Sequence, residues 1–135
     1  MLWNNLKIKH YHKYRFKKIA KKGKLLNKGI LGLRALESGF LRDTELKMLY
    51  FFLKKNIKKK AKVWFFLNPD FAYTKKPIQV RMGKGKGTFV GMYSKLVRGK
   101  IFFEIYSKNI NFMKSILKQL ILRLNIKVRI VKNNF

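Results

Sequence analysis

The sequence predicts an α+β fold built as one domain, and three observations point to that class. The chain has 135 residues, the length of one ordinary domain. Two stretches place apolar residues three or four positions apart, which is the period of an amphipathic helix. Shorter stretches rich in β-branched and aromatic residues are bounded by turn residues, which is typical of strands. Because these helix and strand patterns are mixed along the chain, we expect a mixed or antiparallel sheet with two helices.

The first strand and the first helix are predicted before residue 61. The segment ILGLRAL at 30–36 has a strand-like composition. A helix is predicted from Asp43, which is a good N-cap residue, and Glu45 favours the positive end of the helix dipole. The apolar stripe of this helix consists of Leu46, Leu49, Leu53 and Ile57.

The middle of the chain is predicted as strands joined by loops. The expected strands are 62–67, 78–82, 88–97 and 100–106, with a turn at 98–100. The only two prolines of the chain, Pro69 and Pro77, stand near the two ends of residues 68–77. This segment is therefore expected to form a loop. A second helix is predicted at 109–125, and 126–132 alternates as a closing strand. The expected apolar face of the second helix consists of Ile110, Met113, Leu117, Leu120 or Ile121, and Leu124.

The charge of the chain restricts its partners. Lys and Arg number 34 against 5 acids, which gives a formal net charge of +29. Self-repulsion of this size destabilises a compact state unless a polyanion neutralises it. Nucleic acid is the first expected partner, and an anionic membrane surface is the second. The basic tracts are spread along the whole chain, which favours contact on several sides.

Catalytic, metal and redox functions have little support in the sequence. There is no cysteine, so disulfides and thiolate chemistry are excluded. The five acids form no paired arrangement, and His10 and His12 stand in a basic segment without a nearby acid. No apolar run approaches the roughly 20 residues that span a bilayer, and no signal peptide is recognised. We therefore expect no enzyme, no cofactor or metal, no small-molecule substrate and no membrane insertion.

The segment VRMGKGKGTFV at 80–90 is the strongest candidate binding site. It fails the spacing of a P-loop and of a dinucleotide fingerprint, and no helix pattern follows it. Alternating glycines let the backbone adopt positive φ and approach a ligand closely. Lys84 and Lys86 add point charges, and Arg81 adds a planar fork suited to phosphate or a base edge. Met82 is flexible enough to pack against a base or sugar. The alternative is a mobile hairpin tip with solubilising lysines.

Residues 1–29 form a second basic segment. They contain no acid, and Tyr11, Tyr14 and Phe16 stand among the bases. Aromatic rings stack on unpaired bases while lysines hold phosphates, so an RNA-binding arm is predicted. A flexible solvated tail is the alternative. The expected organisation is an arm at 1–29, a domain at 30–132 and a tail at 133–135.

Several motifs resemble one protein family in collinear order. TKKP at 74–77 followed by RMGKGKG at 81–87 resembles the signature of the bacterial-type large-subunit ribosomal protein sixteen. GLRALESGFL (32–41), KVWFFLNPD (62–70), RGKIFFEI (98–105) and HKYR (12–15) are also similar to segments of that family. The resemblance implies an α/β-hammerhead type fold packed against large-subunit rRNA and neighbouring ribosomal proteins, beside the aminoacyl-tRNA site near the peptidyl transferase centre. The residues implied to bind rRNA or tRNA are Arg81, Met82, Gly83, Lys84, Gly85, Lys86, Gly87, His12, Lys13, Arg15, Lys75 and Lys76.

The chain departs from the family pattern at a few positions. Tyr14 stands where the family has glycine, Val90 and Met92 stand near the places of a glutamate and a tryptophan, and Arg98 stands where the family has proline. The composition is also rich in residues with AT-rich codons, with 27 Lys, 12 Ile and 10 Asn. Together these features favour a mitochondrial ribosome, with a plastid or an AT-rich bacterium as alternatives. A non-ribosomal basic protein that coats nucleic acid or acts at anionic membranes is the alternative function.

Overall fold

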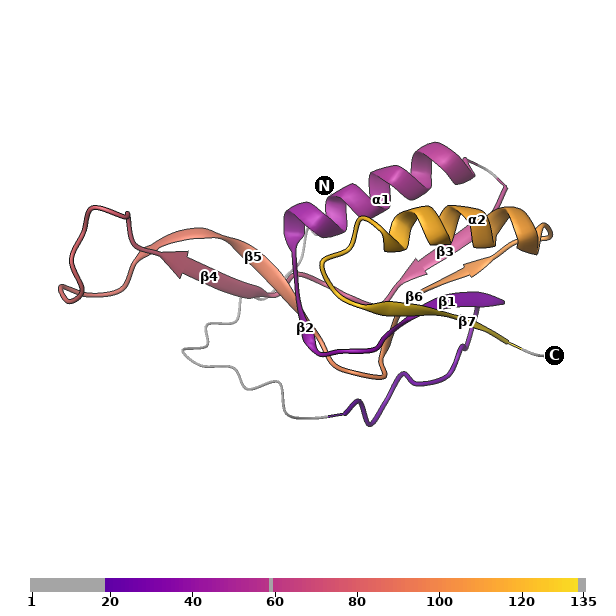
Figure 1. Cartoon of the computed structure of the whole chain (residues 1–135), viewed down its shortest axis with the longest axis horizontal. Helices are drawn as coiled ribbons and strands as arrows, with labels where there is room; N and C mark the ends of the chain where they lie inside the picture. The colour runs from indigo at the N-terminus through magenta and orange to yellow at the C-terminus, as the bar shows by residue number, and fades with distance from the viewer. Residues whose placement is uncertain (1–18, 59, 134–135) are drawn as a thin grey trace.

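The computed structural model of the chain describes residues 19–58 and 60–133. The elements follow in the order β1 (Leu31–Ala35), β2 (Gly39–Arg42), α1 (Asp43–Ile57), β3 (Lys62–Phe65), β4 (Phe71–Lys75), β5 (Thr88–Leu96), β6 (Ile101–Tyr106), α2 (Ile110–Ile121) and β7 (Val128–Lys132). They form two sheets in which every strand pair is antiparallel, and Figure 1 shows both helices on one side of the larger sheet. The predicted α+β class with two helices is confirmed.

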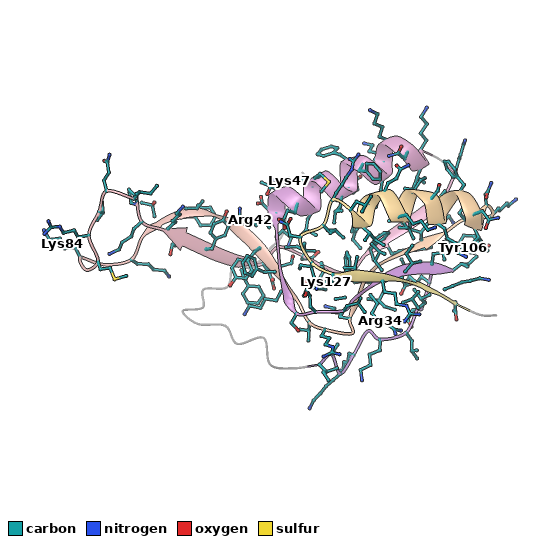
Figure 2. All side chains as sticks on the ribbon, in the orientation of Figure 1. Arg34, Arg42, Lys47, Lys84, Tyr106 and Lys127 are labelled. Carbon is teal, nitrogen blue, oxygen red and sulfur yellow. The ribbon has the colours of Figure 1, made fainter. Side chains whose placement is uncertain are left out.

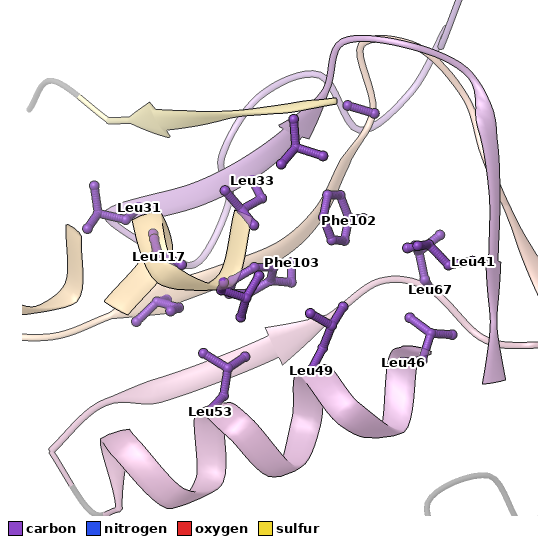
Figure 3. Packing of buried hydrophobic residues seen from close by; sticks show 14 of the residues in the cluster. Leu31, Leu33, Leu41, Leu46, Leu49, Leu53, Leu67, Phe102, Phe103 and Leu117 are labelled. Atoms are coloured by element: carbon purple, nitrogen blue, oxygen red, sulfur yellow. The ribbon is translucent and has the colours of Figure 1, made fainter. Parts of the chain in front are cut away.

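The larger sheet has the order β3-β6-β1-β7 and carries the hydrophobic core. Strand β6 is buried along almost its whole length, and Phe102 and Phe103 are fully buried. Figure 3 shows Leu49 and Leu53 on the side of α1 that faces Phe103. The Phe103 ring also stacks on the ring of Phe65 in β3, with 5.6 Å between centroids. The core therefore lies between this sheet and the two helices.

The two helices confirm the predicted apolar stripes. Leu46, Leu49, Leu53 and Ile57 are all buried in α1. In α2 the buried residues are Met113, Ile116, Leu117 and Leu120, while Ile110, Ile121 and Leu124 pack partly buried against the core. The helix packing thus follows from the 3.6-residue period of the sequence.

The start of α1 differs from the prediction by one residue. The N-cap is Arg42, and Asp43 is the first helical residue. The Glu45 carboxylate, inside the helix, accepts a hydrogen bond from the backbone N–H of the N-cap residue Arg42 at 3.0 Å. This bond stabilises the start of the helix. Asp43 instead accepts a hydrogen bond from Lys47 one turn later at 3.1 Å. Both acids still lie at the positive end of the helix dipole, as expected.

The smaller sheet has the order β2-β5-β4 and corrects two predictions. Residues 71–75, predicted as loop, form β4, and residues 78–82, predicted as strand, form turn and irregular structure. The physical reason is pairing: β4 finds a partner in β5, whereas the described structure offers none to residues 78–82, which lie beyond the last pair, Lys75 with Thr88. The β-branched residues Ile78 and Val80 therefore have a high strand propensity but do not form a strand.

Strand β2 was also missed by the sequence prediction. Gly39–Arg42 pairs with β5 immediately before the helix, in a segment to which the sequence analysis assigned no element. Leu41 in this strand is fully buried. Strand β2 thereby connects the core to the hairpin formed by β4 and β5.

The described part of the basic arm lies against the domain. Backbone hydrogen bonds join Ala20 to Arg98 at 2.9 Å and Gly23 to Ile101 at 2.8 Å. Glu104, which is only 2% exposed, accepts hydrogen bonds from the backbone N–H groups of residues 27–29 at 2.7–3.1 Å. A carboxylate in β6 therefore fixes the segment that leads into β1. Residues His12, Lys13 and Arg15 lie outside the described residues.

Candidate nucleic-acid interface

The β4–β5 hairpin carries the glycine-rich segment away from the core. Strand β5 has nine residues, which corresponds to a length of about 30 Å. Its residue Leu96 is fully buried at one end, and Thr88 is exposed at the other. Figure 1 shows the hairpin projecting beyond the helices and the larger sheet, and Figure 2 places Lys84 at its extremity. The hairpin thus presents its tip at a distance from the rest of the domain.

The hairpin tip, residues 75–88, is cationic and exposed. It contains five cations and no acid: Lys75, Lys76, Arg81, Lys84 and Lys86. Every residue from Pro77 to Lys86 is exposed. The structure therefore brings nine of the predicted site residues together, because Lys75 ends β4, Lys76 follows it, and residues 81–87 lead into β5.

Large apolar side chains are exposed at the same tip and at the adjoining start of β5. Ile78 is 94% exposed and Met82 is 102% exposed, and Val80, Phe89 and Val90 are each more than half exposed. Neighbouring exposed apolar side chains of this kind are typical of interaction surfaces. The sequence analysis singled out Met82 only. Ile78 and Val80 were also a signal, because two apolar residues beside a cationic loop could have been predicted to contact a partner.

The glycines of the tip have two distinct roles. Gly83 and Gly85 have φ of +105° and +89°, and Lys84 between them has φ of +51°. No atom lies within 4 Å of a Cβ placed on either glycine, so both face open space. At Gly87, by contrast, a Cβ would lie 2.5 Å from the carbonyl carbon of Lys75. Gly87 therefore allows the two strands to close, whereas Gly83 and Gly85 shape the free end.

Three hydrogen bonds hold the tip in its shape. The Lys76 ammonium donates to the carbonyl oxygen of Gly83, across the loop. The Thr88 hydroxyl donates to the carbonyl of Lys75 at 3.3 Å, and the Val80 N–H donates to the carbonyl of Pro77 at 3.2 Å. Lys76 is therefore directed inward, whereas Lys75, Arg81, Lys84 and Lys86 are exposed.

An aromatic cluster at the base of the hairpin was missed by the sequence analysis. The Tyr93 ring contacts Phe71 and Phe40, each with 5.6 Å between centroids, and Tyr73 at 6.3 Å. The Lys95 ammonium lies 3.6 Å from the centroid of the Phe71 ring, a cation–π contact. The signal was present as alternating aromatics in FAY at 71–73, but those residues were assigned to a loop.

The acids of the chain serve its own structure. Glu37 accepts the N–H of Lys127 at 2.9 Å, and Glu104 accepts three backbone N–H groups. Asp43 and Glu45 serve the start of α1, and Asp70 also has an interaction partner. Within residues 19–58 and 60–133, no group of three His, Cys, Asp or Glu side chains is arranged to hold a metal ion. In the same residues, neither helix has the length and hydropathy of a membrane span.

Comparison with known proteins identifies the family. Residues 4–131 match the family described as Ribosomal protein L16p/L10e. The chain is similar to the large ribosomal subunit protein uL16 of Thermosipho africanus, with 33% identity over 129 residues that cover 96% of this chain and 91% of that protein. It is equally similar to the protein of the same name from Mycobacterium tuberculosis, with 33% identity over 127 residues, 93% of this chain and 92% of the relative. The chain therefore belongs to the ribosomal protein L16p/L10e family and is a structural protein of the large ribosomal subunit.

Proposed function

We propose that this protein binds large-subunit rRNA through the hairpin tip and helps to position aminoacyl-tRNA near the peptidyl transferase centre. The observation that carries the proposal is the projecting tip with its exposed RMGKGKG segment, which contains three exposed cations, a fully exposed Met82 and no acid. Family membership supports the same role and makes a non-ribosomal coat for nucleic acid or membranes the weaker alternative.

The proposed mechanism is scaffolding without bond chemistry. Arg81, Lys84 and Lys86 neutralise phosphates, and the guanidinium of Arg81 also offers a bidentate fork. Because Gly83 and Gly85 leave open space around their α-carbons, the loop backbone can lie directly against RNA. Met82 supplies an apolar contact to a base or sugar. His12, Lys13 and Arg15 of the arm are proposed to add further rRNA contacts.

We also propose that the ribosome concerned is mitochondrial. The support is the excess of Lys, Ile and Asn and the departures from the family pattern at Tyr14, Val90, Met92 and Arg98. The relatives named above come from bacteria, so a plastid or a bacterial cytoplasm is the competing location.

One fractionation experiment tests both proposals. A tagged copy is expressed in the source cells, organelles are separated, and lysates are sedimented through sucrose gradients at low and at moderate KCl. We expect the tag to sediment with large subunits of the mitochondrial fraction at both salt concentrations. Sedimentation with free nucleic acid or membranes would contradict the ribosomal role. Sedimentation with plastid or cytoplasmic ribosomes would contradict only the compartment.

A further inference from the structure

A second basic surface lies at the opposite end of the molecule from the hairpin tip. Figure 2 places Lys84 at one extremity and Tyr106, the last residue of β6, at the other. Chain segments that are distant in sequence meet at this end. Their lysines are Lys60 after α1, Lys108 between β6 and α2, Lys114 in α2 and Lys132 at the end of β7. We call these four residues the lysine end.

Two adjoining hollows join these lysines into one surface. The larger has a volume of about 550 Å³ and is lined by Lys108, Asn109, Ile110, Asn111, Lys114 and Lys132. The smaller, of about 380 Å³, is lined by Lys60, Ser107, Lys108, Asn109, Phe112 and Met113. Lys108 and Asn109 line both. The surface is therefore concave and continuous, and no acid is among the residues that line it.

The acids of the fold do not neutralise these charges. In the described parts of the chain, no carboxylate pairs with any lysine of the lysine end, and three of the four are exposed, with Lys114 partly buried. Lys60 instead lies with its ammonium 5.6 Å from the centroid of the Phe112 ring, which is 39% exposed. Four cations gathered without a counter-charge repel one another, and a polyanion removes that cost.

The chemistry of the surface matches an RNA backbone. Lysine ammonium groups are point charges that bind phosphates without base specificity. The exposed Phe112 ring offers a face on which a base can stack, and the exposed amide of Asn111 can hydrogen-bond a ribose hydroxyl.

We propose that the lysine end binds the phosphate backbone of a second rRNA segment, different from the one at the hairpin tip. The protein then bridges two RNA segments along its long axis. The inference rests on the ribosomal function proposed above and assigns it a second contact. It gives a physical reason for the spread of lysines along the sequence, because one tip cannot use them all.

Salt release from assembled large subunits tests this bridge. The variant Lys108→Gln/Lys114→Gln/Lys132→Gln removes three charges from the lysine end. The matched control Lys47→Gln/Lys118→Gln/Lys127→Gln removes three exposed charges elsewhere. Binding of each full-length protein to large subunits is measured against KCl concentration. We expect the log–log salt slope to decrease by two to three units in the first variant and by less than one unit in the control, at roughly one unit per phosphate contact.

Equal slopes for the two variants would overturn the proposal, because they would mean that only total charge matters. Binding of the wild-type protein distinguishes a failure of the bridge from a failure of the proposed ribosomal function. If wild type fails to bind large subunits, the proposed function itself is wrong. If wild type binds and the two triple variants behave alike, only the bridge is wrong.

A second measurement locates the RNA directly. The natural chain has no cysteine, so Lys108→Cys and Lys84→Cys each create a unique attachment site for an iron chelate that cleaves nearby RNA. We expect the two positions to cleave different rRNA segments in assembled subunits. Cleavage of the same segment from both positions, or no cleavage from position 108, would overturn the proposal even if the salt slopes differ.

Discussion

The core and the hairpin tip place the same kinds of residue in opposite environments. In the core, Phe103 is fully buried and packs against Phe65 and the leucines of α1. At the tip, Met82 and Ile78 are almost entirely exposed. Apolar burial stabilises the domain by roughly 25 cal/mol per Å² of surface, and Ile78 and Met82 gain almost none of it from the described chain. The core sequence thus serves folding, whereas the exposed apolar residues of the tip contribute little to it.

This comparison separates stability from binding. Core variants should unfold the protein and lose binding as a consequence. Tip variants should lose binding while the domain remains folded. The expected loss of unfolding free energy therefore decreases from variants in the core to variants at the tip.

Phe103→Ala should cause the largest loss of stability. The ring fills the centre of the core between β6 and α1, and a cavity of that size costs about 3–5 kcal/mol. Urea unfolding monitored by circular dichroism measures the loss. Phe89→Ala is the control, because Phe89 is more than half exposed in β5 next to the tip. Equal losses for the two variants would mean that the tip is packed as tightly as the core.

Glu104→Gln should give the next largest effect. The carboxylate accepts three backbone N–H groups, and the amide can offer only one oxygen, so buried donors lose partners at a cost of about 1–3 kcal/mol. Glu37→Gln is the matched control, since Glu37 accepts a single exposed N–H from Lys127. Urea unfolding compares the two, and hydrogen exchange at residues 27–29 should accelerate in the first variant only. Unchanged exchange there would show that Glu104 does not hold the arm.

Gly85→Val should affect ribosome function more than stability. A non-glycine residue at φ of +89° is strained by about 1–2 kcal/mol, but the loop is surrounded by open space and can relax. The measurements are urea unfolding and aminoacyl-tRNA binding to ribosomes that carry the variant. In Gly87→Val the new side chain meets the backbone of Lys75, so hydrogen exchange near Thr88 should increase. If Gly85→Val unfolds the domain, the glycine is a folding requirement.

Lys84→Ala/Lys86→Ala should leave the unfolding free energy unchanged. Both side chains are exposed at the tip, so the expected change is in RNA binding alone. The log–log salt slope should decrease by up to two units, at roughly one unit per lost phosphate contact. Lys118→Ala/Lys127→Ala is the control with the same change in charge. A slope equal to that of wild type would show that neither tip lysine contacts phosphate.

The sequence predicted the helices and most strands because their signals are local. The stripe Leu46, Leu49, Leu53 and Ile57 identifies the buried face of α1 without knowledge of what it packs against. The alternation of Ile126, Val128 and Ile130 likewise identifies the inner face of the last strand. The position of β4 was not predictable in this way. Strand propensity favoured residues 78–82, and only pairing with β5 decides for 71–75.

The candidate site was predicted in part for a similar reason. The glycines and cations of 81–87 are recognisable from composition and motif, and the structure places them together at one tip. The aromatic cluster around Tyr93 depends on the register of β2, β4 and β5, which the sequence alone does not provide. Gly85 and Gly87 have different roles because only Gly87 lies close to the backbone of Lys75. This distance cannot be predicted from the motif GKGKG.

The acids of the chain accept hydrogen bonds within its own fold, and this affects the stability of the protein before it binds RNA. Glu37, Asp43, Glu45 and Glu104 are engaged with the protein's own backbone and helix ends. The formal net charge of +29 already includes all five acids, so this charge is not offset within the chain. RNA that binds the native state stabilises it by mass action, by about 2.7 kcal/mol at one hundred times the dissociation constant. An unassembled copy lacks that contribution and is the least stable form of the molecule. We therefore expect its abundance in a cell to follow the supply of rRNA.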